Sequence, residues 1–389
     1  MADGIVIAGV LALRFLLPLS ILRYPLPGIL AAMLADSIDG AIFDSYTSVS
    51  LENYQFYDKS LDIYYLAIAY IATLRNWVDP AALRIAQFLW YYRLFGVALF
   101  ATMDARVLLF IFPATFEYFF IFYEAVRLRW NPEALGLGTL LGVAAGSWVF
   151  LKLPQEYWLH IAEGSTTEWL KESVFGMDPS TPRLEVLAAN LWILPVLAAI
   201  AGLVMVAGAL ALRYGPAPHH PLSFDANRYG PAAIGMVGRP RLSWPLFSLS
   251  VAEKVVLVTL VSIIFAEFLP GVDATAFQMT VAISVVVVLN AGISSWQARR
   301  GGAWRAATAE FGAIVVVNSG IVLVIAELAR WTDASLSLVT ALFYGLLLSL
   351  LITLYDRYQH QRVWWVLQGG GQPTGGTEVR ARAVAGVRR

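Results

Sequence analysis

The chain contains no cysteine, and only four of its 389 residues are histidine. The absence of cysteine excludes disulfides, thiolate metal sites and cysteine nucleophiles. Two of the histidines have acids at helical spacing but no second histidine beside them, and the other two follow each other between prolines. We therefore expect no histidine-based metal site. The four residues are His160, His219, His220 and His360.

Charge is also scarce. Only 14% of the residues are charged, against about 25% in soluble domains. The formal net charge is zero, which argues against a nucleic acid as partner. Hydrophobic residues make up 59% of the chain, and the mean hydropathy is +0.66. We therefore expect this chain to be embedded in a lipid bilayer.

Apolar segments long enough to cross a hydrocarbon core of about 30 Å recur along the whole sequence. One of them, 27–44, is shorter and ends in acids, so it either spans or re-enters. No basic region precedes the first segment, which we interpret as a retained helix. We predict an all-α, polytopic transmembrane helical bundle of 10–11 spans. The candidates are 4–22, 27–44, 61–76, 81–101, 106–125, 136–151, 187–212, 250–269, 275–294, 308–329 and 334–356.

Composition divides the chain into four parts. Residues 1–212 form an aromatic-rich transmembrane half with an external loop at 152–185. A loop rich in proline and glycine follows at 213–249. Residues 250–368 form an aliphatic transmembrane half, and the arginine-rich tail at 369–389 is expected to be disordered.

Basic residues predict the orientation, because lysine and arginine collect in cytoplasmic loops. Arginines fill the loop 213–249, the short loop 299–305 and the start of the tail, which fall on one side if the spans alternate. The loop 152–185 holds six acids and three bases. We therefore predict a cytoplasmic (inner) membrane protein whose C-terminus is cytoplasmic and whose 152–185 loop is external.

The first constellation that could carry chemistry is acidic. Asp36 and Asp39 are three residues apart, and Asp58 and Asp62 are four apart. Residues at these spacings share one face of a helix, so two facing helices would present four carboxylates to one point. Oxygen ligands suit Mg²⁺ or Mn²⁺, and such an ion could bind a diphosphate. A plainer interpretation places the acids at helix ends and in a hydrated loop.

This cluster resembles the signature of the CDP-alcohol phosphotransferases. That family has Asp-x-x-Asp-Gly-x-x-Ala-Arg, then eight residues, then Gly-x-x-x-Asp-x-x-x-Asp. Residues Asp36, Asp39, Gly40, Asp58 and Asp62 match it in type, over 27 residues. The resemblance implies that the acids bind a divalent metal and that Asp62 is the catalytic base that activates an acceptor alcohol.

The sequence also departs from that signature. Phe43 and Asp44 stand where the family has Ala-Arg, and Tyr54 replaces the second glycine. The second pair of acids arrives one residue late. The family works at the cytoplasmic face, whereas the orientation above places these acids outside.

The second constellation consists of charges within predicted spans. Arg93 and Glu117 lie near the middles of two consecutive spans. A charge at that depth costs at least about 2.5–3.5 kcal/mol on insertion scales and normally faces a partner or a cavity. We predict that Arg93 and Glu117 are neighbours, with Glu124 on the same face and Arg14 able to join them. The group is either an ion pair that fixes packing or a polar cavity that binds an anionic head group or relays protons.

Two further signals concern packing in the first half. Gly138, Gly142 and Gly146 recur every four residues, a spacing that lets helix backbones approach closely. We predict helix packing there, and a homodimer is a second use of the same face. Pro113 is expected to kink its helix and to free backbone groups that need other partners.

In the second half, Asn290 and Asn318 are expected to form hydrogen bonds between helices. Glu267 and Glu327 lie near helix ends and are expected at the membrane interface.

Three classes of function remain. The first, which we favour, is a divalent-metal-dependent transferase acting on a phosphorylated lipid or alcohol, with a polyprenyl-phosphate-using glycosyltransferase as a variant and a lipid-linked substrate as partner. The second is a transporter or channel that uses the Arg93, Glu117 and Glu124 path. The third is a non-catalytic scaffold. Carboxylates that converge on one point would favour the transferase, and a continuous polar path through the bilayer would favour the transporter.

Overall fold

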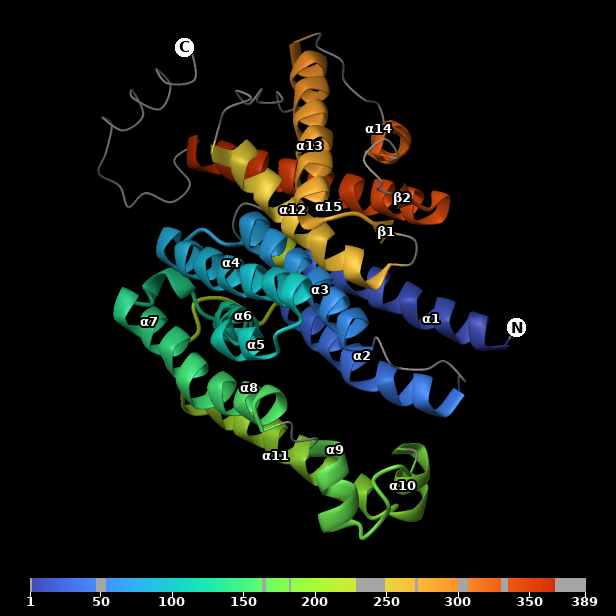
Figure 1. Cartoon of the computed structure of the whole chain (residues 1–389). Helices are drawn as coiled ribbons and strands as arrows, with labels where there is room; N and C mark the ends of the chain where they lie inside the picture. Colours follow the sequence, from blue (N-terminus) through green and yellow to red (C-terminus); the bar gives the residue numbers. More distant parts are fainter. Residues whose placement is uncertain are drawn as a thin grey trace.

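The computed structural model describes residues 2–46, 54–162, 166–181, 183–228, 249–269, 272–299, 307–329 and 335–367. Over these ranges the chain is almost entirely helical (Figure 1), which confirms the predicted all-α fold. The exception is one antiparallel pair of two-residue strands, β1 (Val272–Asp273) and β2 (Ser335–Leu336).

Seven helices are long and apolar enough to cross a membrane, and two shorter apolar helices, Ala276–Gly292 and Phe311–Glu327, accompany them in the described residues. Nine of the eleven predicted spans overlap one of these nine helices, whereas 61–76 and 81–101 lie in helices that are not among them. The chain is therefore a multi-pass membrane protein. The seven are Gly4–Leu22, Pro25–Phe43, Val107–Arg127, Leu137–His160, Ile193–Leu210, Leu249–Glu267 and Leu338–Gln359.

The N-terminal part is a tight helical hairpin. Helix α1 (Ala2–Leu16) continues into the 3₁₀ helix η1 (Leu17–Leu22), and α2 (Pro25–Tyr46) runs back beside it. The segment 27–44 is thus part of one continuous helix of 22 residues. A Cβ atom on Gly28 would lie 2.7 Å from the backbone nitrogen of Ile21, so the close turn requires glycine there.

The centre of the first half is α3 (Tyr54–Asn76), which packs against α1, α2 and α4 (Pro80–Met103). Most of its side chains between positions 60 and 74 are buried. The side chain of Asp79 caps α4 by accepting a hydrogen bond of 2.8 Å from the backbone nitrogen of Ala81. An aromatic layer of fully buried side chains fills the space between α3, α4 and α6: Trp77, Trp90, Phe116, Phe119, Phe120 and Tyr123.

Pro113 does more than kink its helix. The helix ends after α5 (Val107–Ile111) and begins again as α6 (Thr115–Arg127), so the backbone is open in between. The next span is continuous over α7 (Leu137–Gly146), the π-helical turn η3 (Ser147–Lys152) and α8 (Leu153–His160).

The glycine stripe lies on α7, but no neighbouring helix uses it. An added Cβ on Gly138, Gly142 or Gly146 would meet nothing within 4 Å. The stripe therefore does not mediate packing within the described chain, and the homodimer remains a prediction.

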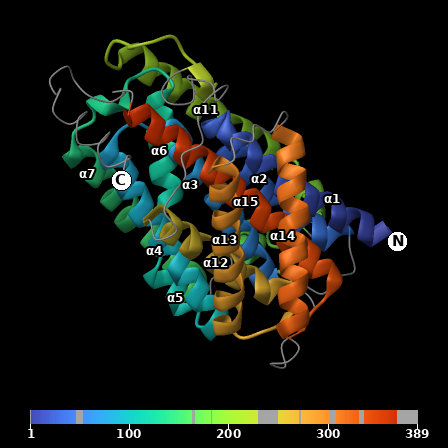
Figure 2. The same cartoon turned by 90° about the horizontal axis from the view of Figure 1, so that it is seen from above.

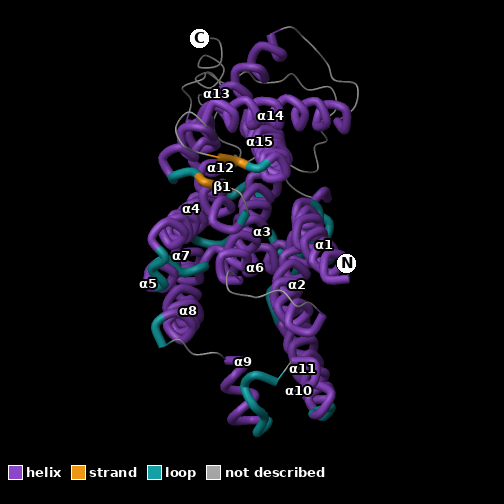
Figure 3. Tube along the Cα trace, turned by 45° about the vertical axis from the view of Figure 1, so that its right-hand side comes forward, coloured by secondary structure: helices purple, strands orange, loops and turns teal. Residues whose placement is uncertain are grey.

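After α8, the chain forms α9 (Thr166–Trp169), the π-helical η4 (Leu170–Val174) and α10 (Arg183–Ala189), which lie lowest in Figure 3. They lead into α11 (Ile193–Tyr214). The apolar window of α11 has no buried residue. The following residues, 215–228, end in the 3₁₀ helix η5 (Ala226–Arg228) and contact Arg23 and Arg129 through backbone hydrogen bonds.

The second half contains α12 (Leu249–Phe268), α13 (Ala276–Arg299), α14 (Ala307–Ala329) and α15 (Leu338–Leu367). Helices α12 and α15 pack against α3, and α13 and α14 run at a steep angle to α15 (Figures 1 and 2). The predicted hydrogen bonds are confirmed. Asn290 donates to Asn318 at 2.8 Å, and Asn318 donates to the Ser349 hydroxyl at 2.9 Å.

Arginines gather at one end of the bundle. Arg23 forms an ion pair with Asp225, and the guanidinium of Arg75 lies over the ring of Tyr358, near the end of α15. The start of the predicted 213–249 loop and the end of α15 therefore share one end of the molecule. Residues 229–248 and the tail from 368 lie outside the described ranges.

Candidate functional site

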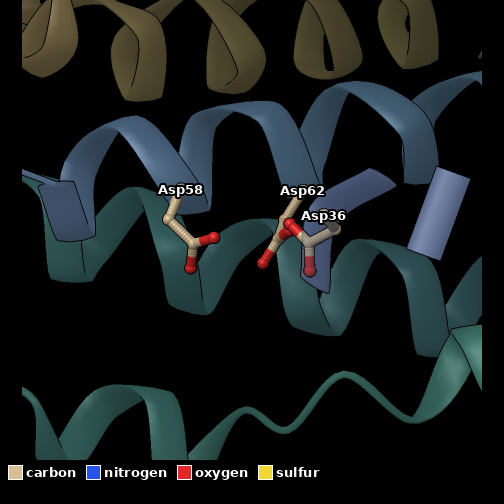
Figure 4. Close-up of side chains that lie close together, drawn as sticks. All are labelled: Asp36, Asp58 and Asp62. Atoms are coloured by element: carbon tan, nitrogen blue, oxygen red, sulfur yellow. The ribbon is translucent and has the colours of Figure 1, made fainter. Parts of the chain in front are cut away.

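The predicted acids converge. Asp36 lies on α2, and Asp58 and Asp62 lie on α3. Each residue offers one carboxylate oxygen, and these oxygens all lie within 4.8 Å of one another. Figure 4 shows the three side chains gathered in one place. These acids lie inside helices, so the plainer interpretation, with helix ends and a hydrated loop, is wrong for them.

Asp39 completes the cluster from the buried side. It lies one turn after Asp36, its side chain is 1% exposed, and the Tyr57 hydroxyl donates to it at 3.4 Å. The other three carboxylates keep 16–27% of their side-chain surface exposed. The site is therefore closed on one side and reachable on the other.

Arg14 lies among these acids rather than with Arg93, where the sequence analysis expected it. From α1 it donates a short hydrogen bond to Asp36, and its Nε lies 3.5 Å from Asp39. Its Nη2 lies 3.7 Å from Oδ1 of Asp62. The place of a residue within its predicted span gives its depth in the membrane but not the helices that it faces. The sequence therefore could not tell whether Arg14 joins the aspartates or Arg93.

Lys59 is the second cation of the cluster. Its ammonium lies 2.7 Å from Asp58 and 3.1 Å from Asp62. Four carboxylates (−4) with Arg14 and Lys59 (+2) leave a formal charge of −2. Arg14 and Lys59 thus neutralise half of the negative charge without a metal, and the remaining charge matches one divalent cation.

Two polar atoms in the cluster are buried without a hydrogen-bond partner in the described part of the chain. They are Nη2 of Arg14 and Oδ1 of Asp62. At 3.7 Å they are too far apart to satisfy each other. A buried charged donor that lacks a partner is costly, so this location suits a further ligand.

A second charged cluster lies beside the first, but its pairing differs from the prediction. Arg93 faces Glu156 at 3.7 Å, and Glu117 faces Lys152 at 3.8 Å. Arg93 and Glu117 are close enough to attract each other electrostatically, but their ion pairs in the described residues are with Glu156 and Lys152. The predicted direct pair was wrong because Lys152 and Glu156 were assigned to an external loop, whereas the helix continues to His160. His160 lies 3.0 Å from the other oxygen of Glu156.

This second cluster provides partners for the break at Pro113. Arg93 donates to the carbonyl oxygens of Phe112 at 2.9 Å and Leu109 at 3.4 Å. Glu156 accepts from the backbone nitrogen of Ala114 at 3.4 Å. Because backbone groups inside a membrane must be satisfied by protein, these contacts support the structural interpretation of the cluster.

Glu124 does not belong to the same group as Glu117. It accepts a hydrogen bond of 2.7 Å from the Trp77 indole and pairs with Arg127 at 3.0 Å. The aromatic layer lies between the two acids. Glu124 is on the side of the arginine-rich end of the molecule, and Glu117 is on the side of the aspartates.

The two charged clusters interact. Lys59 is close enough to Arg93 for their charges to repel, and Glu156 is attracted to Lys59. Glu117 and Asp62 also interact electrostatically. The charges thus form one belt that extends from Arg14 to His160.

Sequence reasoning missed Glu253. This acid of α12 accepts hydrogen bonds from Gln87 at 3.0 Å, Tyr91 at 3.2 Å and Tyr355 at 2.8 Å, and a short one from Tyr70. It thereby joins α3, α4 and α15 to α12. Its hydrogen-bond partners carry no charge, so the sequence contains no sign of these contacts.

Beyond the predicted spans, Asp225 fastens the 215–228 segment to the bundle. The backbone nitrogen of Asn227 donates to its carboxylate at 2.9 Å, and Arg23 pairs with it at 3.1 Å. The hydrogen bond from Asn227, together with the Arg23 interaction, lowers the pKa of Asp225.

Comparison of the chain with family models, with curated proteins and with solved structures finds no match.

Proposed function

We propose that this protein is a divalent-metal-dependent membrane transferase that acts on a phosphorylated lipid or alcohol. The observation that carries the proposal is the convergence of Asp36, Asp58 and Asp62 from two helices, with ligand oxygens within 4.8 Å of one another. The resemblance to the CDP-alcohol phosphotransferase signature supports the same chemistry.

Mg²⁺ or Mn²⁺ suits this donor set, because carboxylate oxygens are hard ligands and the cluster retains a charge of −2. Such an ion, when bound, would neutralise charge on a phosphate. Asp36, Asp58 and Asp62 would hold it, with Asp39 behind them.

Asp62 is the proposed base. Its Oδ1 is buried without a hydrogen-bond partner among the described residues, and Lys59 holds its Oδ2 at 3.1 Å. In the phosphotransfer reaction, the acceptor hydroxyl oxygen attacks the phosphorus of the donor. The bond from phosphorus to the leaving-group oxygen breaks, and the hydroxyl proton passes to Asp62.

A lipid-linked substrate suits the surroundings of the site. On α2, the apolar side chains of Leu30, Leu34 and Ile38 are 43–61% exposed. They lie at four-residue intervals and so share one face that lipid can cover. Asp36 lies two residues from Leu34 and Ile38 and therefore on another face of α2, where its side chain is 27% exposed. Lipid can thus cover one face of the helix beside the site, while the acids open on the other.

The aromatic layer argues against the transporter or channel. Between Asp62 and the end of α3, no charged residue occurs before Arg75, and none lies between Glu117 and Glu124 on α6. The fully buried rings of Trp77 and Phe120 stack in this region with centroids 5.7 Å apart. The charged belt thus ends at the layer, which supports a site with one opening.

We further propose that the arginine-rich end is cytoplasmic, following the positive-inside rule. The acids then lie in the outer half of the membrane, because Asp62 is closer to Tyr54 than to Asn76 along α3. This suits a polyprenyl-phosphate-linked donor. A cysteine at Leu222 should react with an impermeant maleimide only after permeabilisation of cells, and one at Ser180 before it; the reverse pattern would invert the orientation.

The activity test uses purified protein in lipid nanodiscs with Mn²⁺. One reaction contains CDP-diacylglycerol and a polyol phosphate, and the other contains a polyprenyl-phosphate sugar and a sugar acceptor. Release of CMP supports the phosphotransferase, and release of polyprenyl phosphate supports the glycosyl-transferring variant. Asp58→Asn should abolish either product, whereas Asp225→Asn, at the other end of the molecule, should not. No turnover of either donor class would contradict the proposal.

A further inference from the structure

Arg14 is held in place by contacts that do not involve the acids. The carbonyl oxygen of the next residue, Phe15, accepts a hydrogen bond of 2.9 Å from the Tyr64 hydroxyl. The Phe15 ring also packs against Tyr64 and Phe343, with centroids 4.9 and 5.4 Å apart. Helix α1 is thereby fixed to α3 and α15, and the position of Arg14 is set by the bundle.

The guanidinium of Arg14 faces three different carboxylates but is not saturated by them. Its side chain is 3% exposed. Nη1 donates to Asp36, whereas Nη2 lies 3.7 Å from Asp62 and has no hydrogen-bond partner in the described ranges. A guanidinium has five N–H donors in a planar fork, and this geometry matches the oxygens of a phosphate.

The other deeply buried arginine of the belt is different. Arg93 uses its Nη1 to donate to two backbone carbonyls and faces Glu156 as well. The helix break at Pro113 accounts for Arg93. Neutralising the acids would explain why a positive charge is present at Arg14. It would not explain why Nη2 of Arg14 has no hydrogen bond beside Asp62, the proposed base.

We propose that Arg14 is the phosphate-binding residue of this site, with its unpartnered Nη2 donating to an oxygen of the transferred phosphate group. The inference rests on the proposed function and identifies its substrate as a phosphate ester or diphosphate. Arg14 binds the phosphate next to Asp62, which places the phosphorus beside the base. A phosphate on a lipid and one on a soluble alcohol share this chemistry.

The test measures two affinities of the purified protein, one for Mn²⁺ and one for inorganic pyrophosphate as the probe. Arg14→Lys keeps the charge but loses the fork. We expect its affinity for Mn²⁺ to stay within about twofold of wild type, and its affinity for pyrophosphate to fall at least about tenfold, the effect of a lost charged hydrogen bond. Arg93→Lys is the matched control and should leave pyrophosphate binding unchanged.

A second variant removes the guanidinium while keeping the formal charge of the cluster, so that a loss of binding is not due to misfolding. Arg14→Gln with Asp39→Asn leaves three carboxylates and Lys59, so the formal charge of the cluster stays at −2, and the three converging acids remain. This pair should also bind Mn²⁺ and fail to bind pyrophosphate, and Asp39→Asn alone shows how much of either change comes from the loss of the Asp39 carboxylate. Competition by short-chain phosphatidic acid and by glycerol 3-phosphate then distinguishes a lipid phosphate from a soluble one.

The outcomes separate the two proposals. If Mn²⁺ binds and both Arg14 variants bind pyrophosphate as wild type does, the inference is overturned while the proposed metal site stands. If Mn²⁺ does not bind but pyrophosphate binding depends on Arg14, the metal chemistry is wrong and the role of Arg14 holds. If wild type does not bind pyrophosphate with or without Mn²⁺, the inference is wrong.

Discussion

Arg93 donates a hydrogen bond of 2.9 Å to the carbonyl oxygen of Phe112, at the point where the chain between α5 and α6 leaves the helix. Pro113 cannot supply a backbone N–H, and its ring prevents a continuous helix. A buried arginine on the neighbouring helix thus replaces hydrogen bonds that the helix itself would otherwise form.

The first prediction follows from this contact. Arg93→Met should destabilise the protein by about 1–3 kcal/mol, because buried carbonyls and Glu156 lose their partner. The measurement is thermal unfolding in detergent. Adding Pro113→Ala should restore part of the loss, since alanine allows the helix to close over the gap. If the double variant is no more stable than Arg93→Met, the helix break is not what Arg93 stabilises.

The second prediction concerns Lys59, whose ammonium lies within 3.1 Å of both Asp58 and Asp62. It thus occupies part of the space in which a cation would bind the same carboxylates. Lys59→Met removes a positive charge that lies 2.7 Å from Asp58 and 3.1 Å from Asp62, so the affinity for Mn²⁺ should rise at least about tenfold. Lys152→Met removes a lysine buried in the neighbouring cluster and should have a smaller effect. Weaker binding of Mn²⁺ by Lys59→Met would show that the lysine supports the site instead.

The third prediction is a dependence on pH at the other end of the molecule. The pKa of Asp225 is lowered in the folded protein, so its contacts contribute fully above the ordinary pKa of about 3.9 and are lost as the pH falls through the folded value. A spin label on Leu222→Cys should be immobile at pH 6 and become mobile only when the pH falls through the lowered pKa of Asp225, below its ordinary value of about 3.9. Asp225→Asn should make it mobile at both. A label that stays immobile at low pH would contradict this.

Sequence alone predicted the positions of the helices and the convergence of the acids, because both follow from local periodicity. Asp36 and Asp39 share a helix face by spacing, and so do Asp58 and Asp62. Partners across helices were harder to predict. Arg14 was expected to join Arg93 and Glu117 but lies among the aspartates, since depth in a span does not specify which helices adjoin.

Two other residues show why the remaining contacts were missed. Glu156 was assigned to a loop because charged residues follow the apolar run, although the helix continues through the π-helical turn η3. Glu253 stabilises the junction of the two halves through tyrosine hydroxyls and an amide. Such neutral partners leave no pattern in the sequence.

The central claim is that the acids of α2 and α3 form a divalent cation site, and the most direct test is the stoichiometry of Mn²⁺ binding. Electron paramagnetic resonance of free Mn²⁺, titrated with purified protein, counts the bound ions. We predict one Mn²⁺ per chain for wild type and for Asp225→Asn, and none for Asp58→Asn. No binding by wild type at millimolar Mn²⁺, or equal binding by Asp58→Asn, would contradict the account.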